Sequence, residues 1–384
     1  MIEPLLISSP VLAALLAGFS SRYSALTRYT KNVQKGALEY TEELPPVSMI
    51  LTCHNQGTQL EENLPLLLDQ DYPNFQVIVV DDHSDDHSED VLKEMSLKYK
   101  NLYHTFTPEN SRYATHNKLA LTIGIKAAQN EWLLFTQPDC KPNGSQWIKC
   151  MARNFTPTTD VVLGYANYEK ESGLANQLIS YDRFLENVKA LGSVLHNKKP
   201  YRGDFCNMAF RKSVFLSNRG FEKNLFLKSG EDTLFINEVG TESNMRAELS
   251  AEATMQQENP FRFRSWRHDK EMDVETRRHT TSVNRMKDWL NGLHTLLLFC
   301  FYLLTYAEIA WGALHQDWLL LAINVLCLLL VFTLNVINVR RSAVCVPGRK
   351  FCISRFYLEP IRVLYSCYFW LRWKFSKKDK YLRK

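Results

Sequence analysis

The chain has 384 residues, of which 45% are hydrophobic and 23% are charged, and its formal net charge is +5. This length is enough for one sizeable domain with accessory segments, and the mild net charge gives no reason to expect a nucleic-acid partner. The nine cysteines are scattered without a CxxC pair, and their odd number argues against a closed disulfide framework. We therefore expect a reduced, cytosolic compartment for the globular part.

Residues 1–22 are predicted to form an N-terminal membrane anchor. The stretch from Ile2 to Phe19 is mostly apolar, and a basic cluster follows it between Arg22 and Lys35. Because this cluster lies after the apolar run rather than before it, an uncleaved anchor is favoured over a signal peptide. The same asymmetry predicts that the chain continues on the cytoplasmic side of the membrane.

From Pro46 the chain alternates between short apolar runs and helical patterns, which is typical of a parallel, doubly wound α/β sheet. Strands are predicted at 47–51, 75–80 and 132–135, and a helix at about 117–129 leads into the last of them. Polar residues fall where the three strands end, namely Thr52, Asp82 and Asp139. Ligands bind outside the carboxyl ends of such strands, so we expect these residues to converge on a site.

Asp139 follows the apolar run Trp132–Phe135 after a turn at Pro138. A lone carboxylate in that position suits a hard divalent cation, Mg²⁺ or Mn²⁺, whose other ligands would be water and substrate phosphate. The alternative for Asp139 taken by itself is a solvated aspartate in a turn.

Several segments, in order and spacing, resemble the inverting family 2 glycosyltransferases, which have a GT-A fold. They read PVSMILTCHNQ, VIVVDDHSDD, NKLALTIGIKAA, LLFTQPDC, GDFCNMAFRKSVF and SGEDTLFINEV. The resemblance covers residues 46–289 and implies a cytosolic α/β GT-A domain, a doubly wound mixed sheet of the nucleotide-diphospho-sugar transferase type. It also implies a nucleotide-diphosphate sugar as donor and a divalent cation (Mg²⁺ or Mn²⁺) as cofactor.

On the donor side, the resemblance places Thr52 and Asp82 around the nucleotide base and ribose, where a hydroxyl and a carboxylate can form hydrogen bonds. Asp82 is also a good turn residue, and that alternative remains open. Lys118 matches the lysine of the family's Gly-Lys pair near the donor, although Asn117 stands in place of the glycine. The alternative for Lys118 is a solvated lysine at a helix start.

The resemblance matches Asp139 to the last Asp of the family's DxD motif, which holds the cation that bridges the donor diphosphate. The first Asp of that motif is Gln137 here, an uncharged amide that can still accept a hydrogen bond. Farther along, VETRRH falls where many relatives carry QxxRW, and Arg278 would clamp the diphosphate with its planar set of donors. The alternative for this stretch is a basic helix that faces the membrane.

Asp232 matches the Asp of the family's "ED" segment, which is the general base of the reaction. In that role it deprotonates the acceptor hydroxyl as the hydroxyl attacks the anomeric carbon from the far side. The alternative for Glu231 and Asp232 is N-capping of the helix that the following apolar residues predict.

The C-terminal part is predicted to lie in and on the membrane. Residues 290–339 hold two apolar stretches whose short connection has no Lys or Arg, which indicates a transmembrane helical hairpin. Residues 340–384 are aromatic and basic, which suits an interfacial helix followed by a basic tail. By the positive-inside rule, we expect a multi-pass protein of the cell (inner) membrane with its catalytic domain in the cytoplasm.

Together these features predict a membrane-associated glycosyltransferase of the hexosyltransferase type. It would transfer a sugar with inversion from a nucleotide-diphosphate sugar, with UDP favoured, to a lipid-linked or glycan acceptor. One alternative is a sugar nucleotidyltransferase of similar fold, which Asp232 and the C-terminal hairpin argue against. The other is a catalytically degenerate homologue that acts as a partner in a polysaccharide synthesis complex. Gln137, Asn117 and His279, which replaces the tryptophan of QxxRW, favour this alternative.

Overall fold

The structure is a computed structural model of the 384-residue chain. It describes residues 5–18, 26, 29, 31–33, 35–36, 38–108, 116–196, 198, 202–258, 262–343, 351, 354–377 and 380–381. Parts of the predicted anchor (1–4 and 19–22) and of the predicted basic tail (378–379 and 382–384) lie outside these ranges.

A seven-stranded mixed sheet forms the centre of the α/β body, with the strand order β3-β2-β1-β4-β8-β6-β9. Its strands are β1 (Val47–Cys53), β2 (Phe75–Asp81), β3 (Leu102–Phe106), β4 (Trp132–Phe135), β6 (Val161–Gly164), β8 (Met208–Arg211) and β9 (Met245–Glu248). Strands β1 to β4 run parallel to one another, whereas β8 is antiparallel to both β4 and β6. The mixed α/β sheet is confirmed.

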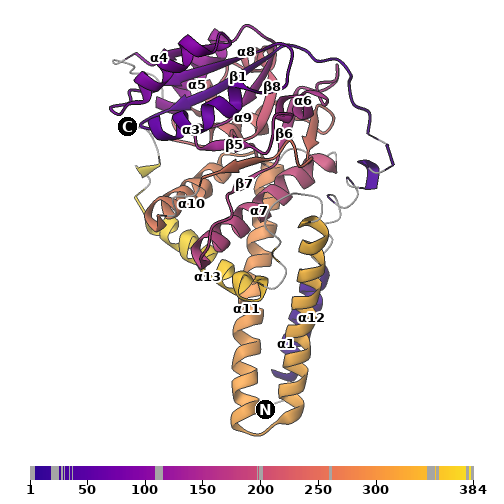
Figure 1. The fold of residues 1–384 in the computed structure, drawn as a ribbon. Helices are drawn as coiled ribbons and strands as arrows, with labels where there is room; N and C mark the ends of the chain where they lie inside the picture. The colour runs from indigo at the N-terminus through magenta and orange to yellow at the C-terminus, as the bar shows by residue number, and fades with distance from the viewer. Residues whose placement is uncertain are drawn as a thin grey trace.

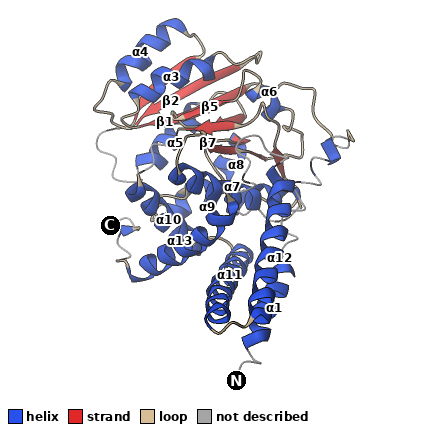
Figure 2. Cartoon of the chain, turned by 60° about the horizontal axis from the view of Figure 1, so that its bottom comes forward, coloured by secondary structure: helices blue, strands red, loops and turns tan. Residues whose placement is uncertain are grey.

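Helices cover both faces of this sheet (Figure 2). Successive residues of a strand point to opposite faces, which is why the apolar runs of β1 and β2 divide between two cores. Ile50 and Ile78 belong to one core, and Leu51 and Val79 belong to the other. The helices of the body are α3 (Gly57–Leu68), α4 (Ser88–Lys98), α5 (His116–Ala127), α6 (Trp147–Ala152), α7 (Leu174–Leu195), α8 (Lys212–Ser217), α9 (Glu231–Val239) and α10 (Phe263–Arg278), with a 3-10 turn at Glu222–Asn224.

A small second sheet lies beside the end of β4, with the order β5-β10-β7. It consists of β5 (Cys140–Pro142), β10 (Met255–Gln257) and β7 (Ala166–Tyr168). Gln257 pairs with Cys140 across this sheet. The pairing therefore brings residues that are more than a hundred positions apart to the segment that carries Asp139.

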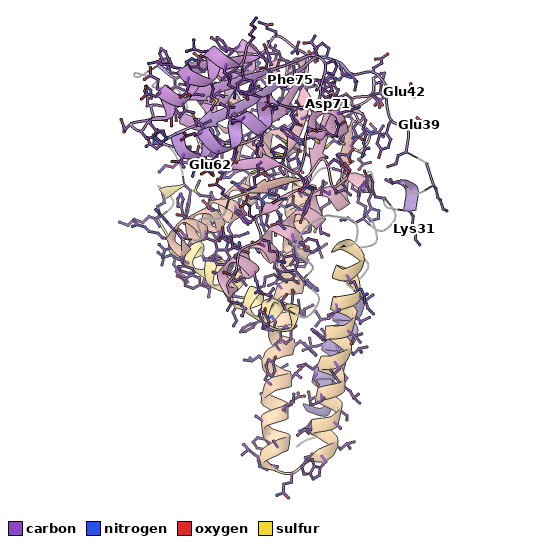
Figure 3. The ribbon with its side chains drawn as sticks, in the orientation of Figure 1. Lys31, Glu39, Glu42, Glu62, Asp71 and Phe75 are labelled. Carbon is purple, nitrogen blue, oxygen red and sulfur yellow. The ribbon has the colours of Figure 1, made fainter. Side chains whose placement is uncertain are left out.

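Three helices extend away from the α/β body: α1 (Leu5–Gly18), α11 (Ser282–Leu314) and α12 (Trp318–Ala343) (Figure 1). Their shared core includes Leu16 of α1, Phe301 of α11 and Val331 of α12. Side chains project outward along α11 and α12 (Figure 3), and large apolar residues of both helices are exposed, such as Leu303 and Leu326. Within the described part of the chain, only α11 is long and apolar enough to cross a membrane, and an apolar segment of α12, Trp318–Leu334, is shorter.

The last helix, α13 (Arg355–Phe375), returns to the body and packs against α7, α10 and α11. Tyr365 of α13 donates a hydrogen bond to Asp182 of α7 at 2.7 Å, and Trp373 donates one to Glu275 of α10 at 2.8 Å. This helix was predicted at residues 351–375.

Two sequence expectations are refined by the structure. The strand β3 was missed, because its only fully buried residue is Leu102 and its pattern gives little apolar signal. The predicted domain boundary at residue 289 falls inside α11, which continues from the body into the apolar region as a single helix.

Candidate functional site

A cavity of about 350 Å³ lies where the carboxyl end of β4 meets α7, α10 and the start of α9. Two predicted site residues, Gln137 and Asp232, line it. The other lining residues used below are Asn117, Asp182, Arg183, Glu186, Arg202, Asp204, Glu231, Gln257, Trp266, Asp269, Lys270 and Asp273.

Asp232 is placed by the tight start of α9. Gly230 precedes this helix with φ +89°, a left-handed conformation that suits glycine, and a Cβ there would lie 2.4 Å from the Thr276 side chain. A Cβ on Gly203 would lie 2.7 Å from the Asp232 carbonyl oxygen. The two glycines therefore let α9 pack closely against α10 and against the segment that leads into β8.

The electrostatic environment of Asp232 suits a proton acceptor. The pKa of this carboxyl is raised to about 7, chiefly by burial; the charge of Arg202 lowers it, and the nearby carboxylates of Glu231 and Asp204 raise it. A carboxyl group with a pKa near neutrality can accept a proton in one step and release it in the next. The N–H of Thr233 donates to one Asp232 oxygen at 2.6 Å, whereas the N-cap of the helix is Gly230.

A hydrogen-bonded chain links the end of β1 to the start of α9. The Thr52 hydroxyl donates to the Asn117 side-chain oxygen at 3.0 Å, and the Asn117 amide donates to Glu231. Asn117, which stands in place of the family's glycine, is thus the residue that ties Thr52 to the cavity wall.

Gln137 and Asp139 are held together by Gln257, a residue that the sequence analysis did not single out. The Gln257 amide donates to Gln137 at 3.1 Å and to Asp139 at 2.9 Å. Arg183 in turn donates to the Gln257 side-chain oxygen and pairs with Asp204 at 2.8 Å. This relay holds the Gln137 oxygen at the cavity lining and ties the nearby Asp139 carboxylate to the same amide.

These two oxygens fit a divalent cation that keeps several water or phosphate ligands. Burial raises the pKa of Asp139, while the Gln257 amide and Arg183 oppose that shift, so a cation bound there would compete with a proton. The described residues contain no group of three or more His, Cys, Asp or Glu side chains that could hold a metal by themselves. The candidate metal ligands are therefore one carboxylate, that of Asp139, and one amide oxygen, that of Gln137.

The other predicted residues lie away from the cavity lining. The Asp82 carboxylate accepts a hydrogen bond from Thr107 at 2.8 Å at the end of β2, next to the end of β1. Lys118 is fully buried, and its ammonium donates to the backbone carbonyls of Asn224 and Leu227. The solvated alternative for Lys118 is therefore wrong, and in this structure its ammonium supports the 224–227 segment.

Arg278 lies at the end of α10 with its guanidinium 5.0 Å from the centre of the Trp373 ring. Glu275 of the same VETRRH segment accepts a hydrogen bond from Trp373. In this structure the segment anchors α13, and it does not bring Arg278 to the cavity. In the structure, the VETRRH segment therefore contributes to the packing of α10 against α13.

Comparisons with known proteins agree with this geometry. Residues 48–216 match the model of Glycosyl transferase family 2. Glycosyltransferase AglE of Haloferax volcanii is 28% identical over 137 residues, which is 35% of this chain and 43% of that protein. The teichuronic acid biosynthesis glycosyltransferase TuaG of Bacillus subtilis is 30% identical over 97 residues, 25% of this chain and 37% of that protein. The chain thus spans less than half the length of these curated relatives.

Among solved structures, the chain is similar to the mannosyltransferase PcManGT from Pyrobaculum calidifontis in complex with GDP-Man and Mn²⁺. The identity is 15%, the TM-score is 0.52, and the match covers 96% of this chain and 99% of the other. At this identity the likeness shows the fold alone. With the family match and the mixed sheet, it identifies a GT-A fold, and residues 48–216 form a family 2 glycosyltransferase domain.

Proposed function

We propose that this chain is a membrane-associated inverting glycosyltransferase that uses a nucleotide-diphosphate sugar, with UDP favoured, and a lipid-linked or glycan acceptor. The observation that carries the proposal is Asp232, a cavity-lining carboxyl with a pKa of about 7. A group of this kind is suited to remove a proton from an acceptor hydroxyl near neutral pH. The relative TuaG, named for teichuronic acid biosynthesis, supports a role in polysaccharide synthesis.

The reaction that we propose divides the cavity between donor and acceptor. Gln137 and Asp139 would hold a divalent cation at the donor end, and the cation would supply positive charge near the leaving nucleoside diphosphate. Asp232 accepts the proton of the acceptor hydroxyl on the opposite side of the transferred sugar. Asn117 and Glu231 also line the cavity, are hydrogen-bonded to each other and can orient the sugar hydroxyls.

The charge of the cavity supports the need for a cation. Its lining carries more carboxylates than cationic side chains, so a diphosphate entering alone would meet like charge. A cation at Gln137 and Asp139 removes that repulsion and stabilises the charge that develops on the leaving group.

The membrane part of the proposal rests on α11, α12 and α13. Many large apolar residues of α11 and α12 are exposed, such as Leu303 and Leu326, and a surface rich in such residues suits contact with a membrane. On α13, Leu364, Trp370 and Phe375 are exposed beside Arg372 and Lys374, as expected for a helix at a membrane interface.

The function is tested by incubating the purified full chain, in nanodiscs with Mn²⁺, with a panel of UDP- and GDP-sugars. We expect slow hydrolysis of at least one donor, measured as release of nucleoside diphosphate, and loss of that release with EDTA. Failure to hydrolyse or bind any donor would overturn the proposal and favour the degenerate homologue that acts as a partner in a synthesis complex.

The topology is tested with cysteines introduced at Ser376 and Gln316 and a membrane-impermeant thiol reagent. We expect labelling at Gln316 in intact cells and at Ser376 only after lysis, because basic residues remain on the cytoplasmic side. The opposite pattern would show that the carboxyl end is inverted.

A further inference from the structure

The charges that line the cavity indicate which acceptors it can take. Three cations line it, Arg183, Arg202 and Lys270, and seven carboxylates accompany them. The carboxylates are Asp182, Glu186, Asp204, Glu231, Asp232, Asp269 and Asp273. The lining is therefore rich in hydrogen-bond acceptors and negative in sign.

Each of the three cations is already engaged by a carboxylate. Arg183 pairs with Asp204 at 2.8 Å, and Arg202 pairs with Asp273 at 3.2 Å. Lys270 pairs with Asp182 and lies 3.8 Å from Asp273. Among the described residues, every cation that lines the cavity is thus already paired with a carboxylate. An entering phosphate or carboxylate would need a lining cation without such a partner.

Three lining carboxylates form no ion pair among the described residues: Glu231, Asp232 and Asp269. Glu231 is the most telling, because its Oε2 is buried and accepts no hydrogen bond from the described residues. A buried carboxylate oxygen without a donor is costly, so a ligand that supplies a hydroxyl or ammonium donor would relieve that cost. Sugar hydroxyls supply such donors, whereas phosphate oxygens do not.

We propose that the acceptor side of this cavity takes an uncharged or amino sugar and excludes an acceptor whose reacting end is a phosphate or a carboxylate. This inference rests on the proposed function and narrows its acceptor class. A lipid-linked acceptor then presents a sugar hydroxyl to Asp232, and its anionic lipid phosphate stays outside the cavity.

Trp266 supplies the surface on which that sugar stacks. It lines the cavity from α10, and its ring centre lies 4.9 Å from that of Tyr365 and 5.1 Å from that of Phe369, both on α13. The aromatic cluster therefore runs from the cavity to the helix that we place at the membrane interface. An acceptor sugar attached to a lipid can reach Asp232 from that side.

The chemical step balances without another reagent. The acceptor oxygen forms a bond to the anomeric carbon of the donor sugar, and the bond from that carbon to the diphosphate oxygen breaks. The nucleoside diphosphate leaves with the electron pair of that bond, and Asp232 accepts the hydroxyl proton.

The test measures binding by saturation-transfer NMR on the full chain in nanodiscs that contain no glycoside detergent. The neutral probes are the methyl glycosides of glucose, galactose, mannose and glucosamine, and the anionic probes are methyl glucuronide and glucose 1-phosphate. We expect saturation transfer to at least one neutral or amino-sugar probe and none to the anionic probes. Nucleoside diphosphate release from donors, measured on the same sample, reports the proposed function separately.

Three variants sharpen the result. Trp266→Ala should weaken the transfer about fivefold through loss of stacking, Trp266→Phe should retain most of it, and Trp289→Ala, at an exposed position of α11, should leave it unchanged. Asp269→Lys should admit glucose 1-phosphate. Binding of an anionic probe to the parent chain at least as strongly as the neutral ones would overturn the proposal. So would absence of transfer to every neutral or amino-sugar probe, or full transfer in Trp266→Ala.

Discussion

The two walls of the cavity are held by different forces. On the sheet side, Asn117, Gln137 and Gln257 are fixed by hydrogen bonds of their neutral amide groups, some of which go to charged partners such as Glu231 and Arg183. On the helical side, α7 and α10 face each other through partly buried ion pairs, such as those of Glu186 with Arg277 at 3.3 Å and of Asp182 with Lys270. The sheet wall can be altered one hydrogen bond at a time, whereas the helical wall is a coupled set of charges.

This difference has consequences for function. Removing one partner of a buried ion pair leaves an uncompensated charge, which typically costs about 3–5 kcal/mol. Mutations on the helical wall would therefore confuse stability with activity. Asp232 forms no ion pair with any described residue. Mutations at Asp232 and on the sheet wall can therefore separate effects on activity from effects on folding.

The largest effect is expected at Asp232. Asp232→Asn should cut donor turnover by about 10²-fold or more while donor affinity stays nearly constant, because the variant loses only the proton acceptor. In the parent chain, kcat/KM should rise with pH up to about 7 and then level off, as the carboxyl ionises. The measurement is nucleoside diphosphate release across pH 5–9.

The matched control is Asp71→Asn, the same chemical change at an exposed position that is not part of the cavity lining; the residue is labelled in Figure 3. The Asp71 carboxylate accepts a hydrogen bond from the Gln146 side chain, which an asparagine oxygen can also accept. Near-normal turnover in Asp232→Asn would assign the base to another residue.

The next effect concerns the sheet wall. Asp139→Ala should weaken Mn²⁺-dependent binding of nucleoside diphosphate by more than about 30-fold, whereas Gln137→Ala should weaken it about threefold, because only Asp139 carries charge. Calorimetry with and without Mn²⁺ measures both. Equal, small losses in the two variants would remove the cation from this position.

A smaller effect separates positioning from direct contact. Gln257→Ala should weaken Mn²⁺ binding about tenfold, as is typical when a residue that orients a ligand is removed, without lowering the unfolding temperature. Gln256→Ala is the control, since Gln256 is the neighbouring strand residue and donates instead to Asn143. Manganese affinity is measured by electron paramagnetic resonance. An unchanged affinity in Gln257→Ala would show that the hydrogen bonds of Gln257 do not orient the metal ligands.

The comparison also explains what could be predicted from the sequence. Thr52, Asp82 and Asp139 follow apolar runs, so their placement near the ends of the neighbouring strands β1, β2 and β4 was predictable from local pattern. Asp232 was found through the resemblance of its segment. The sequence therefore located the strand ends beside the sheet wall and the candidate base.

The helical wall and the relay could not be predicted in this way. Arg183, Arg202 and Gln257 lie in segments without a distinctive pattern, and their roles depend on pairings between β10, α7 and α10 that no local signal encodes. Arg278 lies in a family-like segment, and in the structure its guanidinium lies over the Trp373 ring of α13, so its contact with a donor diphosphate stays a prediction. Local sequence patterns indicate which residues end a strand. They do not indicate which charged residues, far apart in the sequence, form ion pairs.

The smallest expected effect concerns the stability of the fold and tests the origin of the Asp232 pKa. The folded-state pKa of about 7 lies above the ordinary value of 3.8. Between these values the unfolded chain releases a proton that the folded chain keeps, so stability falls as pH rises from about 4 to 7 and stays lower above it. Asp232→Asn removes this penalty. The variant should therefore match the parent at pH 4 and be more stable at pH 8. One pKa unit corresponds to about 1.4 kcal/mol, and because the side chain faces a cavity that admits solvent, we expect a gain of about 1 kcal/mol.

Thermal unfolding at both pH values measures this gain in stability, with Asp71→Asn as control. A variant that is less stable than the parent at pH 8 would show that the carboxylate is stabilised rather than strained by its surroundings, and the pH profile of turnover would then lose its explanation.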